Sequence, residues 1–569
     1  MYRPALVVDW LYVIPVASFV NVTLAAGTTA PLESRTVPDI SEVEVWATAS
    51  VAMKNKIRNA GFLIICVAFI TAGIFISRSE NGECHAPGFG NMNSMNLDVE
   101  SCYRAVVTHD TRFDGVIFVG VATTGVYCRT ICPAKTPRRQ SCRFFPSAAA
   151  AEGAGFRPCL RCRPELAPGN ARVDAVNRLA ATIASRIEDG VLTEGNVEQL
   201  AEELHISERH LRRVTQRTFG VSPIELAQTQ RLLLAKRLLT DTDLSVIETA
   251  FASGFASLRR FNALFKQRYR LNPTDLRKRR STHPAPADTF VCEVAYRPPL
   301  DWKSMLSFLS ARSLRGVEAI DGQKYSRTVH LGKHLGWITV QPAKRRNRLS
   351  VELSASLIQG VLPVLARVKR LFDLSADPNE IAAHLGTLAA RHPGLRVPGA
   401  FDGFEVGVRA ILGQQVSVKA ARTLAGRLIE AFGEKIETPI SELTHVFPKP
   451  ERLLESAPTA ITRLGILPAR VESIRAFTKA VVHRTISLEP GTDPEDTIRR
   501  LRELPGIGDW TAHYIAMRAM NWPDAFPHTD LGIRKALKEH RAKRVLEIAD
   551  SWRPWRSYAV MHLWKSLEN

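Results

Sequence analysis

Four cysteines in two short pairs place the strongest constraint on how this chain can fold. Cys128 and Cys132 are separated by three residues, and Cys159 and Cys162 by two. Zn²⁺ prefers four tetrahedral sulfur or nitrogen ligands, which two such loops supply when the fold brings them together. One or two disulfides would be the alternative. The nine cysteines of the 569-residue chain are an odd number and do not resemble a secreted disulfide framework, so the pattern favours zinc in a reducing compartment.

The length and charge of the chain indicate a multidomain protein with a polyanionic partner. A chain of 569 residues is too long for one hydrophobic core. Its 76 Lys and Arg residues against 56 Asp and Glu residues give a formal net charge of +20 and a pI near 9.8. This balance favours nucleic acid as the partner, with an acidic membrane surface second.

Two linkers and changes of periodicity divide the chain into predicted domains. The linkers are "PELAPGN" at 164–170 and "RKRRSTHPAPAD" at 277–288. Alternation predicts strands in "FVCEVAY", "GWITVQP" and "RLSVELS", with a helix at 302–310 between the first two, and helical periodicity resumes near residue 377. We therefore expect a mainly α protein with α+β parts, divided into an extension (1–94), a cysteine domain (95–166), a helical domain (172–280), a mixed α/β domain (289–376) and an all-α domain (377–569).

The extension contains one apolar segment, "GFLIICVAFITAGIFI" at 61–76. It is close to the short limit of about 17–25 residues for a membrane-spanning helix. It could be an anchor, a buried helix, or translated sequence upstream of a true start at Met95. We favour the last, and expect residues 1–94 to be poorly ordered or loosely attached. The protein is then expected to be cytoplasmic and nucleoid-associated, without a stable membrane association through 61–76.

The text around the cysteines resembles the N-terminal zinc domain of the bacterial Ada family over residues 101–165. The matching stretches are "FDGVIFVGVATTGVYCRTICPAKTP" and "AGFRPCLRCRPE". The resemblance implies that Cys128 accepts a methyl group from a methylphosphotriester in DNA, while Cys132, Cys159 and Cys162 remain zinc ligands. Methylation removes negative charge from a site that faces phosphates, so DNA binding should tighten. Cys142 lies outside the pattern and is expected to be a bystander.

The helical domain carries two helix-turn-helix patterns. In "NVEQLAEELHISERHLRRVTQRTFGVSP" a turn at His205-Ile206 and a cap at Ser207 precede a basic helix, and Gly254 and Ser257 repeat the plan. The pair resembles the AraC-type DNA-binding domain over 196–280, which implies promoter DNA as a partner and makes RNA polymerase a candidate partner. A helical bundle that binds no DNA is the alternative. The predicted DNA-contacting side chains are Glu208, Arg209, Arg212, Arg213, Arg259 and Arg260. The phenylalanines expected in the core are Phe251, Phe255, Phe261 and Phe265.

The stretch "LPGIGDWTAHYIAMRA", which begins at Leu504, has the pattern of a helix-hairpin-helix motif. Gly506 and Gly508 allow a tight turn whose backbone N–H groups point outward at the start of the next helix, which is a site for a DNA phosphate. A monovalent cation on the hairpin carbonyls is a further candidate ligand. The motif alone could also be an ordinary helix–helix turn.

Several stretches together resemble the AlkA family of 3-methyladenine DNA glycosylases over residues 289–564. They include "HPGLRVPGAFDGFEVGVRAILGQQVSV", the hairpin text and "SWRPWRSYAVMHLW". The resemblance implies an α/β N-terminal domain followed by an all-α helix-hairpin-helix glycosylase domain, and places the catalytic carboxylate at Asp530. The matching pocket aromatics are Trp510, Tyr514 and Trp564, whereas Trp552 and Trp555 are expected to be packing residues.

The residues suit the hydrolysis of an N-glycosidic bond. Alkylation at N3 or N7 makes a purine cationic, so it leaves readily, and one carboxylate can stabilise the oxocarbenium-like sugar and orient water. The nucleotide is first extruded from the stack, and electron-rich aromatics favour the cationic base. Glycosylases of the wider helix-hairpin-helix superfamily that also cut the strand carry a lysine where this chain has Trp510, so we expect a monofunctional enzyme. There is no cysteine after Cys292, and we expect no iron–sulfur cluster.

The chain departs from the family pattern at three points. The residue that fills the gap left by the flipped base is apolar in the family, but here it is Gln415, after Gln414; both are predicted to contact DNA. Thr529 replaces a carboxylate before Asp530. A second Ada methyltransferase domain, with its Pro-Cys-His-Arg motif, is absent, so direct repair of O6-methylguanine is not expected.

The leading hypothesis is a monomeric fusion of an alkylation-sensing regulator and a base-excision glycosylase, acting on alkylated and promoter double-stranded DNA. One alternative is a transcription activator whose glycosylase half is weak or inactive and only adds DNA contacts. A second alternative is a glycosylase that uses the zinc and AraC-type parts only to find damage.

Overall fold

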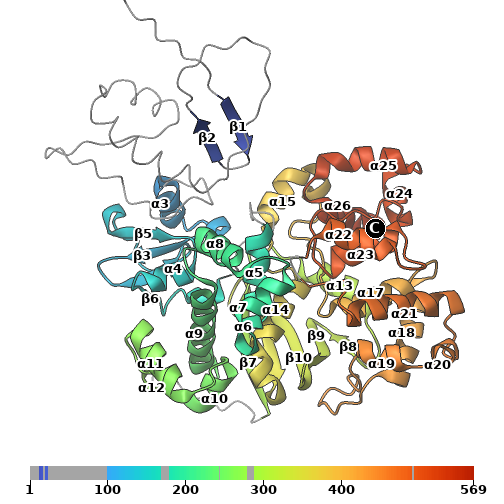
Figure 1. Ribbon diagram of the computed structural model, residues 1–569, viewed down its shortest axis with the longest axis horizontal. Coiled ribbons are helices and arrows are strands. Elements are labelled where there is room, and N and C mark those ends of the chain that lie inside the picture. Colours follow the sequence, from blue (N-terminus) through green and yellow to red (C-terminus); the bar gives the residue numbers. More distant parts are fainter. Residues whose placement is uncertain are drawn as a thin grey trace, which may run out of the picture. The chain divides into compact units, whose positions relative to one another are not determined.

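The computed structural model describes residues 12–16, 19–23, 99–167, 178–242, 244–277, 288–489 and 492–568. The chain divides into two compact units, 1–89 and 90–569. In the first unit, β1 (Tyr12–Val16) and β2 (Phe19–Thr23) form an antiparallel pair (Figure 1). The apolar segment 61–76 and most of the extension lie outside the described residues, so what was expected of them stays a prediction. Among the helices of the described residues, none is long and apolar enough to cross a membrane.

The cysteine domain is built on a four-stranded sheet in the order β5-β3-β4-β6. Strands β3 and β4 pair antiparallel, with Cys128 opposite Val119, and β4 pairs parallel with β6. The first cysteine pair therefore starts at the end of a strand, and the second follows the neighbouring strand. The elements are α3 (Val99–Val107), η1 (Thr111–Phe113), β3 (Phe118–Val121), β4 (Val126–Arg129), η2 (Arg139–Ser141), β5 (Cys142–Phe145), α4 (Ala148–Gly153), β6 (Arg157–Pro158) and η3 (Pro164–Leu166).

The next domain is all helical, as predicted. Its elements are α5 (Arg178–Glu188), α6 (Val191–Glu194), α7 (Val197–Glu203), α8 (Glu208–Phe219), α9 (Pro223–Asp241), α10 (Val246–Ala252), α11 (Leu258–Tyr269) and α12 (Pro273–Arg277). The Ser207 side chain caps α8 and the Ser257 side chain caps α11, each accepting a backbone N–H bond. Gly254 has a φ of 78° in the second turn, a conformation that favours glycine. The two predicted helix-turn-helix units are therefore α7–α8 and α10–α11.

One of the four phenylalanines of this domain was placed wrongly by its spacing. Phe255, Phe261 and Phe265 are buried, and their rings pack in a row. Phe251 is 45% exposed. Phe251 lies near the end of α10, whereas the other three phenylalanines follow the turn at Ser253–Gly254. The turn interrupts the helix, so a helical spacing counted across it does not predict which face Phe251 occupies.

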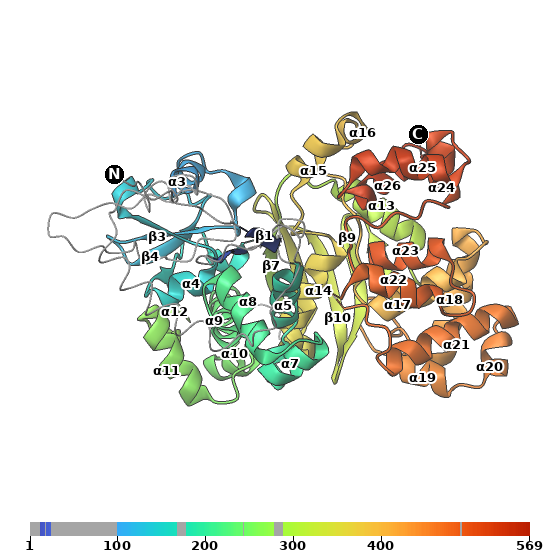
Figure 2. The same ribbon diagram turned by 45° about the horizontal axis from the view of Figure 1, so that its top comes forward.

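The α/β domain has a five-stranded antiparallel sheet in the order β7-β11-β10-β9-β8. Helix α14 and the helical domain's α5 lie side by side in Figures 1 and 2 and are in contact. The elements are β7 (Thr289–Ala295), α13 (Trp302–Arg312), β8 (Glu318–Asp321), β9 (Lys324–Leu331), β10 (His334–Pro342), β11 (Arg348–Ser354), η4 (Ala355–Gly360) and α14 (Val361–Leu371).

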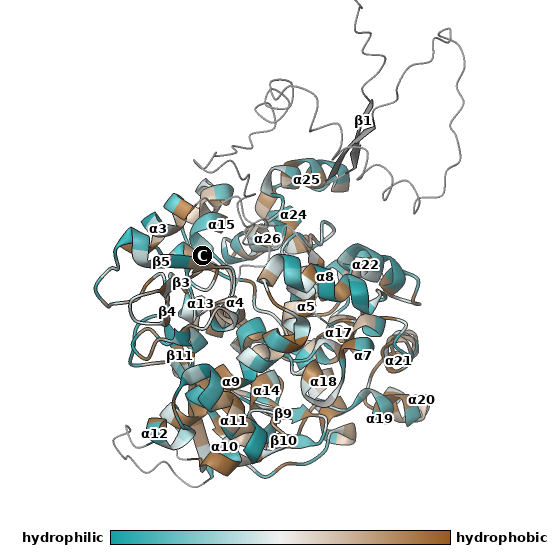
Figure 3. Cartoon of the chain, turned by 60° about the vertical axis from the view of Figure 1, so that its left-hand side comes forward, coloured by the Kyte–Doolittle hydropathy of each residue, from teal (hydrophilic) through white to brown (hydrophobic). Residues whose placement is uncertain are grey.

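Helices make up the remainder of the described chain. They are α15 (Pro378–Leu385), α16 (Thr387–Ala390), α17 (Gly403–Leu412), α18 (Val418–Phe432), α19 (Pro450–Glu455), α20 (Pro458–Thr462), α21 (Pro468–Val482), α22 (Pro494–Arg502), α23 (Asp509–Arg518), α24 (Leu531–Leu537), α25 (Ala542–Ala549), η5 (Asp550–Trp552) and α26 (Arg556–Lys565). Helices α22 and α23 enclose the predicted hairpin. Helix α17 packs against α21 and α23, and α24 packs against α26. Helices α8 and α22 are mostly hydrophilic along their length (Figure 3).

Candidate functional site

The four predicted ligand cysteines converge in one buried cluster. The Sγ atoms of Cys128, Cys132, Cys159 and Cys162 all lie within 4.8 Å of one another. Zinc–sulfur bonds of about 2.3 Å in a tetrahedron place neighbouring sulfurs about 3.8 Å apart, so the cluster fits one zinc ion. Cys142 lies outside it, and its thiol donates to the Arg138 carbonyl at 3.4 Å. The residues that the sequence predicted as ligands are thus the ones that the fold brings together.

Backbone N–H groups contact the cysteine sulfurs unequally. The Arg129 N–H donates to Cys162 Sγ and the Arg161 N–H to Cys159 Sγ, both at 3.4 Å. Cys132 receives a backbone bond from Ala134. In the described part of the chain, no backbone N–H bond to Cys128 Sγ is found. An N–H donor withdraws charge from a thiolate, so these bonds lower the nucleophilicity of Cys159 and Cys162.

Buried charges attach the cysteine domain to helix α9. Lys236 of α9 pairs with Glu165 at 2.5 Å, and Arg163 pairs with Glu165 at 2.9 Å and with Asp241 at 2.6 Å. Lys236 and Glu165 are each 2% exposed at their side chains. The charged end of the cysteine domain is therefore held by the helix that joins the two helix-turn-helix units.

A second buried contact joins the same two domains. Glu152 of α4 accepts hydrogen bonds from Tyr127 at 3.0 Å, Thr229 at 3.2 Å and Tyr269 at 3.3 Å. Burial raises the pKa of Glu152 to about 7, although these donors oppose the shift. Since Tyr127 precedes Cys128 in β4, the contact links the strand of the first ligand to α9 and α11.

The predicted DNA-contacting side chains of the helical domain lie on its surface. Arg209, Arg212 and Arg213 are exposed on α8, and Arg259 and Arg260 are exposed on α11. Glu208 forms an i,i+4 ion pair with Arg212 at 3.0 Å. Arginines on the second helix of each unit are available for DNA phosphates and base edges.

Asp530 is the N-cap of α24, and donors hold both of its carboxylate oxygens. Oδ1 accepts from the Ile533 backbone N–H at 3.0 Å and from the Trp564 indole N–H at 2.9 Å. Oδ2 accepts from the Trp510 indole N–H at 2.8 Å. Residues from α23, α24 and α26 therefore fix one carboxylate in one orientation.

Glycine at position 532 is required by the same carboxylate. A Cβ atom there would lie 2.9 Å from Asp530 Oδ1 and 3.0 Å from a ring carbon of Trp564. A side chain at this position would push the acid and the indole apart. Sequence reasoning missed Gly532, because its role follows from the packing of α24 on α26.

Four aromatic rings in contact with one another form a cluster beside Asp530. The rings of Trp510 and Tyr514 stack with centroids 5.1 Å apart, and Tyr514 lies 6.4 Å from Trp564. Phe308 of α13 stacks on Trp564 at 6.3 Å. The three predicted pocket aromatics are thus together, and the α/β domain adds a fourth. Phe308 was in the text that resembles the family, but nothing in its spacing indicated that α13 would reach α26.

Two arginines of the aromatic cluster's surroundings, Arg312 and Arg518, lie over the ring of Phe308. The guanidinium carbons of Arg312 and Arg518 lie 3.8 and 4.8 Å from the Phe308 ring centroid. Arg518 also donates to the Tyr514 hydroxyl at 2.8 Å. Burial alone would raise the pKa of Tyr514, but Arg518, Arg312 and Arg409 outweigh it and lower this pKa below its usual value.

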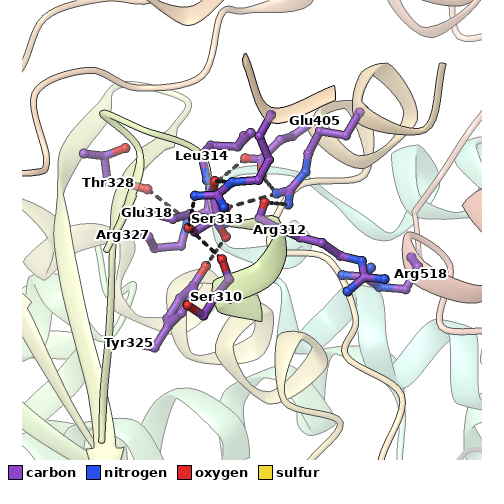
Figure 4. A network of polar contacts seen from close by, with 12 residues as sticks. Ser310, Arg312, Ser313, Leu314, Glu318, Tyr325, Arg327, Thr328, Glu405 and Arg518 are labelled. Carbon is purple, nitrogen blue, oxygen red and sulfur yellow. Dashed lines mark hydrogen bonds and ion pairs between the residues drawn. The ribbon is translucent and has the colours of Figure 1, made fainter. Parts of the chain in front are cut away.

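A buried ion network supports these arginines (Figure 4). Arg409 of α17 pairs with Glu405 at 2.8 Å and with Glu318 of β8 at 3.1 Å. Arg327 of β9 pairs with Glu405 at 2.7 Å, and Arg409 also donates to the Arg312 carbonyl at 2.5 Å. The network joins the sheet of the α/β domain to the helix that precedes the Gln414-Gln415 loop.

The hairpin glycines have different surroundings. Gly506 has a φ of 73°, and a Cβ there would lie 2.1 Å from Ser473 Oγ, so the fold itself requires glycine. Gly508 is the N-cap of α23 without a side-chain cap, and a Cβ there would meet nothing within 4 Å. The backbone at Gly508 is therefore open for a ligand to approach.

The two glutamines that precede α18 are placed differently. Gln414 donates its amide N–H groups to the Gly506 carbonyl at 2.8 Å and to Thr511 Oγ1 at 3.0 Å, so it anchors the loop to the hairpin. Gln415 is exposed and has a φ of 53°.

The two tryptophans that were predicted to be packing residues lie in the core. Trp555 is buried, and Trp552 is partly buried against the core.

Comparison with known proteins covers four segments of the chain. The matching families are the metal binding domain of Ada (101–165), a helix-turn-helix domain (200–279), the AlkA N-terminal domain (291–402) and the HhH-GPD superfamily base excision DNA repair proteins (408–546). These confirm the predicted fold class and the order of its parts.

Relatives share either the whole arrangement or one half of it. The Mycobacterium tuberculosis "Probable bifunctional transcriptional activator/DNA repair enzyme AlkA" is 39% identical over 493 residues, covering 84% of this chain and 98% of that protein. DNA-3-methyladenine glycosylase 2 of Escherichia coli is 38% identical over 47% of this chain and 95% of its own length. The solved 3-methyladenine DNA-glycosylase of Archaeoglobus fulgidus is 20% identical with a TM-score of 0.41, covering 48% of this chain and 97% of that chain. This chain belongs to the AlkA family of bifunctional transcriptional activator/DNA repair enzymes.

Proposed function

We propose that the protein responds to alkylation damage in DNA, as a monofunctional glycosylase joined to a methyl-accepting sensor and an AraC-type regulator. The Asp530 carboxylate, held by two indoles of an aromatic cluster, carries the glycosylase part of the proposal. The names of the relatives support 3-methyladenine and related alkylated bases as substrates.

The geometry suits a flipped, positively charged base. The base lies against Trp510, Tyr514 and Trp564, whose π faces attract a cation. The C1′–N bond breaks with its electron pair leaving on the base, which alkylation has already made cationic. Asp530 stabilises the oxocarbenium-like sugar and orients the water that attacks C1′ and then loses a proton.

The cysteine centre suits a single methyl transfer. A zinc ion held by Cys128, Cys132, Cys159 and Cys162 keeps the sulfurs as thiolates at neutral pH. The Cys128 sulfur attacks the methyl carbon of a methylphosphotriester, and the carbon–oxygen bond electrons return to the phosphate oxygen, which leaves an anionic diester and a thioether. The lack of a backbone N–H bond to Cys128 Sγ among the described residues favours this sulfur over Cys159 and Cys162.

The exposed arginines of α8 and α11 support promoter binding by the regulator half. Methylation of Cys128 lowers the negative charge near the DNA and tightens that binding.

Asp530→Asn tests the glycosylase and separates it from an inactive half that only binds DNA. We expect single-turnover release of 3-methyladenine from methylated duplex DNA to fall by about 10²–10³-fold or more, without strand cutting by either protein. Affinity for the same duplex, measured in parallel, should persist and show that the variant is folded. Base release that survives the substitution would overturn the assigned role of Asp530. A wild-type protein that releases no base would favour the inactive-half alternative.

A further inference from the structure

Exposed apolar side chains gather on the loops around the glycosylase site. Leu531, next to Asp530, is 81% exposed, and Leu467, which precedes α21, is 63% exposed. These are the two most exposed of the large apolar side chains in the described part of the chain. Val416, directly after Gln415, is 36% exposed, and Val418 two residues further on is 45% exposed. Exposed apolar groups beside a DNA-binding hairpin indicate a surface that is covered when DNA is bound.

Leu467 stands in a position that usually carries a polar residue. It is the N-cap of α21, where Ser, Thr, Asp or Asn would satisfy a free backbone N–H, and it supplies no side-chain cap. The leucine therefore adds nothing to the helix through its side chain, and it is not buried in the core. Its side chain is available to a partner.

The loop that carries Leu467 is held firmly from both sides. Arg427 of α18 donates to the Leu464 carbonyl at 2.9 Å. Arg470, in the first turn of α21, donates to the Gln414 carbonyl at 2.7 Å. The second bond ties the Leu467 loop to the residue before Gln415. Gln414 is itself bonded to the hairpin, so the Leu467 loop, the Gln415 loop and the hairpin form one connected rim.

We propose that Leu467 inserts into the base stack beside the flipped nucleotide, while Gln415 hydrogen-bonds to the base left without a partner. The inference rests on the proposed glycosylase function and names the DNA-distorting residue of that site. Gln415 can both donate and accept, which suits the Watson–Crick edge of any orphaned base. A leucine can fill the opened stack because it has no polar group to leave unpaired between the bases. A glutamine in the same place would bury its amide without hydrogen-bond partners.

The experiment compares duplex and single-stranded DNA that carry the same methylated base. Leu467→Ala should lower the single-turnover release rate from duplex by about tenfold or more, because the opened stack is no longer filled. Release from the single strand, which has no pairing to replace, should stay within about twofold of wild type. The fluorescence of 2-aminopurine placed beside the lesion in the duplex should show the same loss of extrusion.

Control variants distinguish the possible failures. Val291→Ala, at a side chain that is 41% exposed on β7, should behave as wild type, and Leu467→Phe should retain extrusion. The inference would be overturned if Leu467→Ala released the base from duplex as fast as Val291→Ala does. It would also be overturned if Leu467→Ala lost the same fraction of its release rate on duplex and on single-stranded DNA. A loss in Leu531→Ala alone would assign insertion to Leu531 instead. If wild type releases no base from either substrate, the glycosylase proposal fails rather than the insertion.

Discussion

Three N–H donors confine the carboxylate of Asp530, and two of them belong to rings of the neighbouring aromatic cluster. Trp510 and Trp564 each donate an indole N–H to one carboxylate oxygen, and each ring contacts the ring of Tyr514. The position of the acid and the position of the base are consequently set by the same two side chains. A change at either tryptophan moves both.

The sequence was sufficient to predict which residue types gather here, but not how they bond. Asp530, Trp510, Tyr514 and Trp564 were identified by resemblance, and the structure brings all four together. The double indole contact depends on three separate helices meeting, which no local pattern encodes. Phe308 escaped prediction for the same reason, since it reaches the Trp564 ring from another domain.

His513 gives the glycosylase domain a predicted sensitivity to acid. Burial lowers the pKa of His513 to about 4, with His528 and nearby arginines adding to the shift. In the unfolded chain the pKa is about 6.5, so between pH 6.5 and 4 the unfolded state binds the additional proton. Stability is therefore full above pH 6.5 and is lost as the pH falls, by about 2 kcal/mol at pH 5 from this group.

Thermal melting measured from pH 7 to pH 5 checks this expectation. His513→Gln keeps an acceptor for the Phe526 N–H, which His513 Nδ1 accepts at 3.4 Å, and it should show a shallower loss of melting temperature. His540→Gln, at an exposed position, should follow wild type. Parallel profiles for His513→Gln and wild type would contradict the assignment.

At the scale of elements, the hairpin glycines separate a requirement of the fold from a requirement of the ligand. Gly506→Ala should destabilise the domain by about 1–2 kcal/mol or more, because its φ is positive and Ser473 occupies the space for a Cβ. Gly508→Ala should keep the melting temperature, since a Cβ there meets nothing within 4 Å.

Gly508→Ala, which should keep its melting temperature, should instead lose affinity for DNA. Affinity of Gly508→Ala for undamaged duplex should fall by about tenfold, because a methyl group would block the approach of a phosphate to the backbone. Fluorescence anisotropy at fixed salt measures it beside wild type. Unchanged affinity would show that the open backbone at Gly508 is not where the phosphate binds.

The sheet of the α/β domain shows where periodicity stops being informative. Strands β7, β10 and β11 were predicted from alternation, and α13 from its helical pattern. Strands β8 and β9 were missed. In β9 five consecutive residues, Tyr325–Val329, are buried, among them Ser326, Arg327 and Thr328, so neither alternation nor hydrophobicity marks the strand. The charge of the buried Arg327 is compensated by Glu405 of another element.

At the scale of the whole molecule, charged side chains join domains that the sequence presents as separate. Arg370 of α14 pairs with Asp189 at 2.6 Å, and Arg186 of α5 pairs with Glu489 at 3.1 Å. Arg297, 2% exposed, donates to the Asp114 carbonyl of the cysteine domain at 2.8 Å. In sequence these arginines are indistinguishable from surface charges, so the contacts between the parts of the chain could not be predicted from it.

The methyl-accepting role is tested on the full chain. Incubation with duplex DNA that carries methylphosphotriesters should add one methyl group to the peptide containing Cys128, as measured by mass spectrometry. The methylated protein should bind DNA about tenfold more tightly at low salt. Cys128→Ser should accept no methyl group, while Cys142→Ala should behave as wild type. Asp530→Asn should be methylated normally.

Two results would contradict the sensor. A methyl group on Cys132, Cys159 or Cys162 would reassign the nucleophile. Methylation of Cys128 without a change in affinity for promoter DNA would support the alternative in which the zinc and helix-turn-helix parts only locate damage.

The presence of Cys128 and Asp530 in one chain has a consequence for how long the response lasts. On the proposed chemistry the sulfur of Cys128 is spent once, whereas Asp530 is regenerated after every base. Each molecule then keeps a permanent record of its first methylphosphotriester while it goes on clearing other lesions. The record is erased only by dilution or turnover of the protein, so the duration of the response would follow the lifetime of the chain rather than the lifetime of the damage.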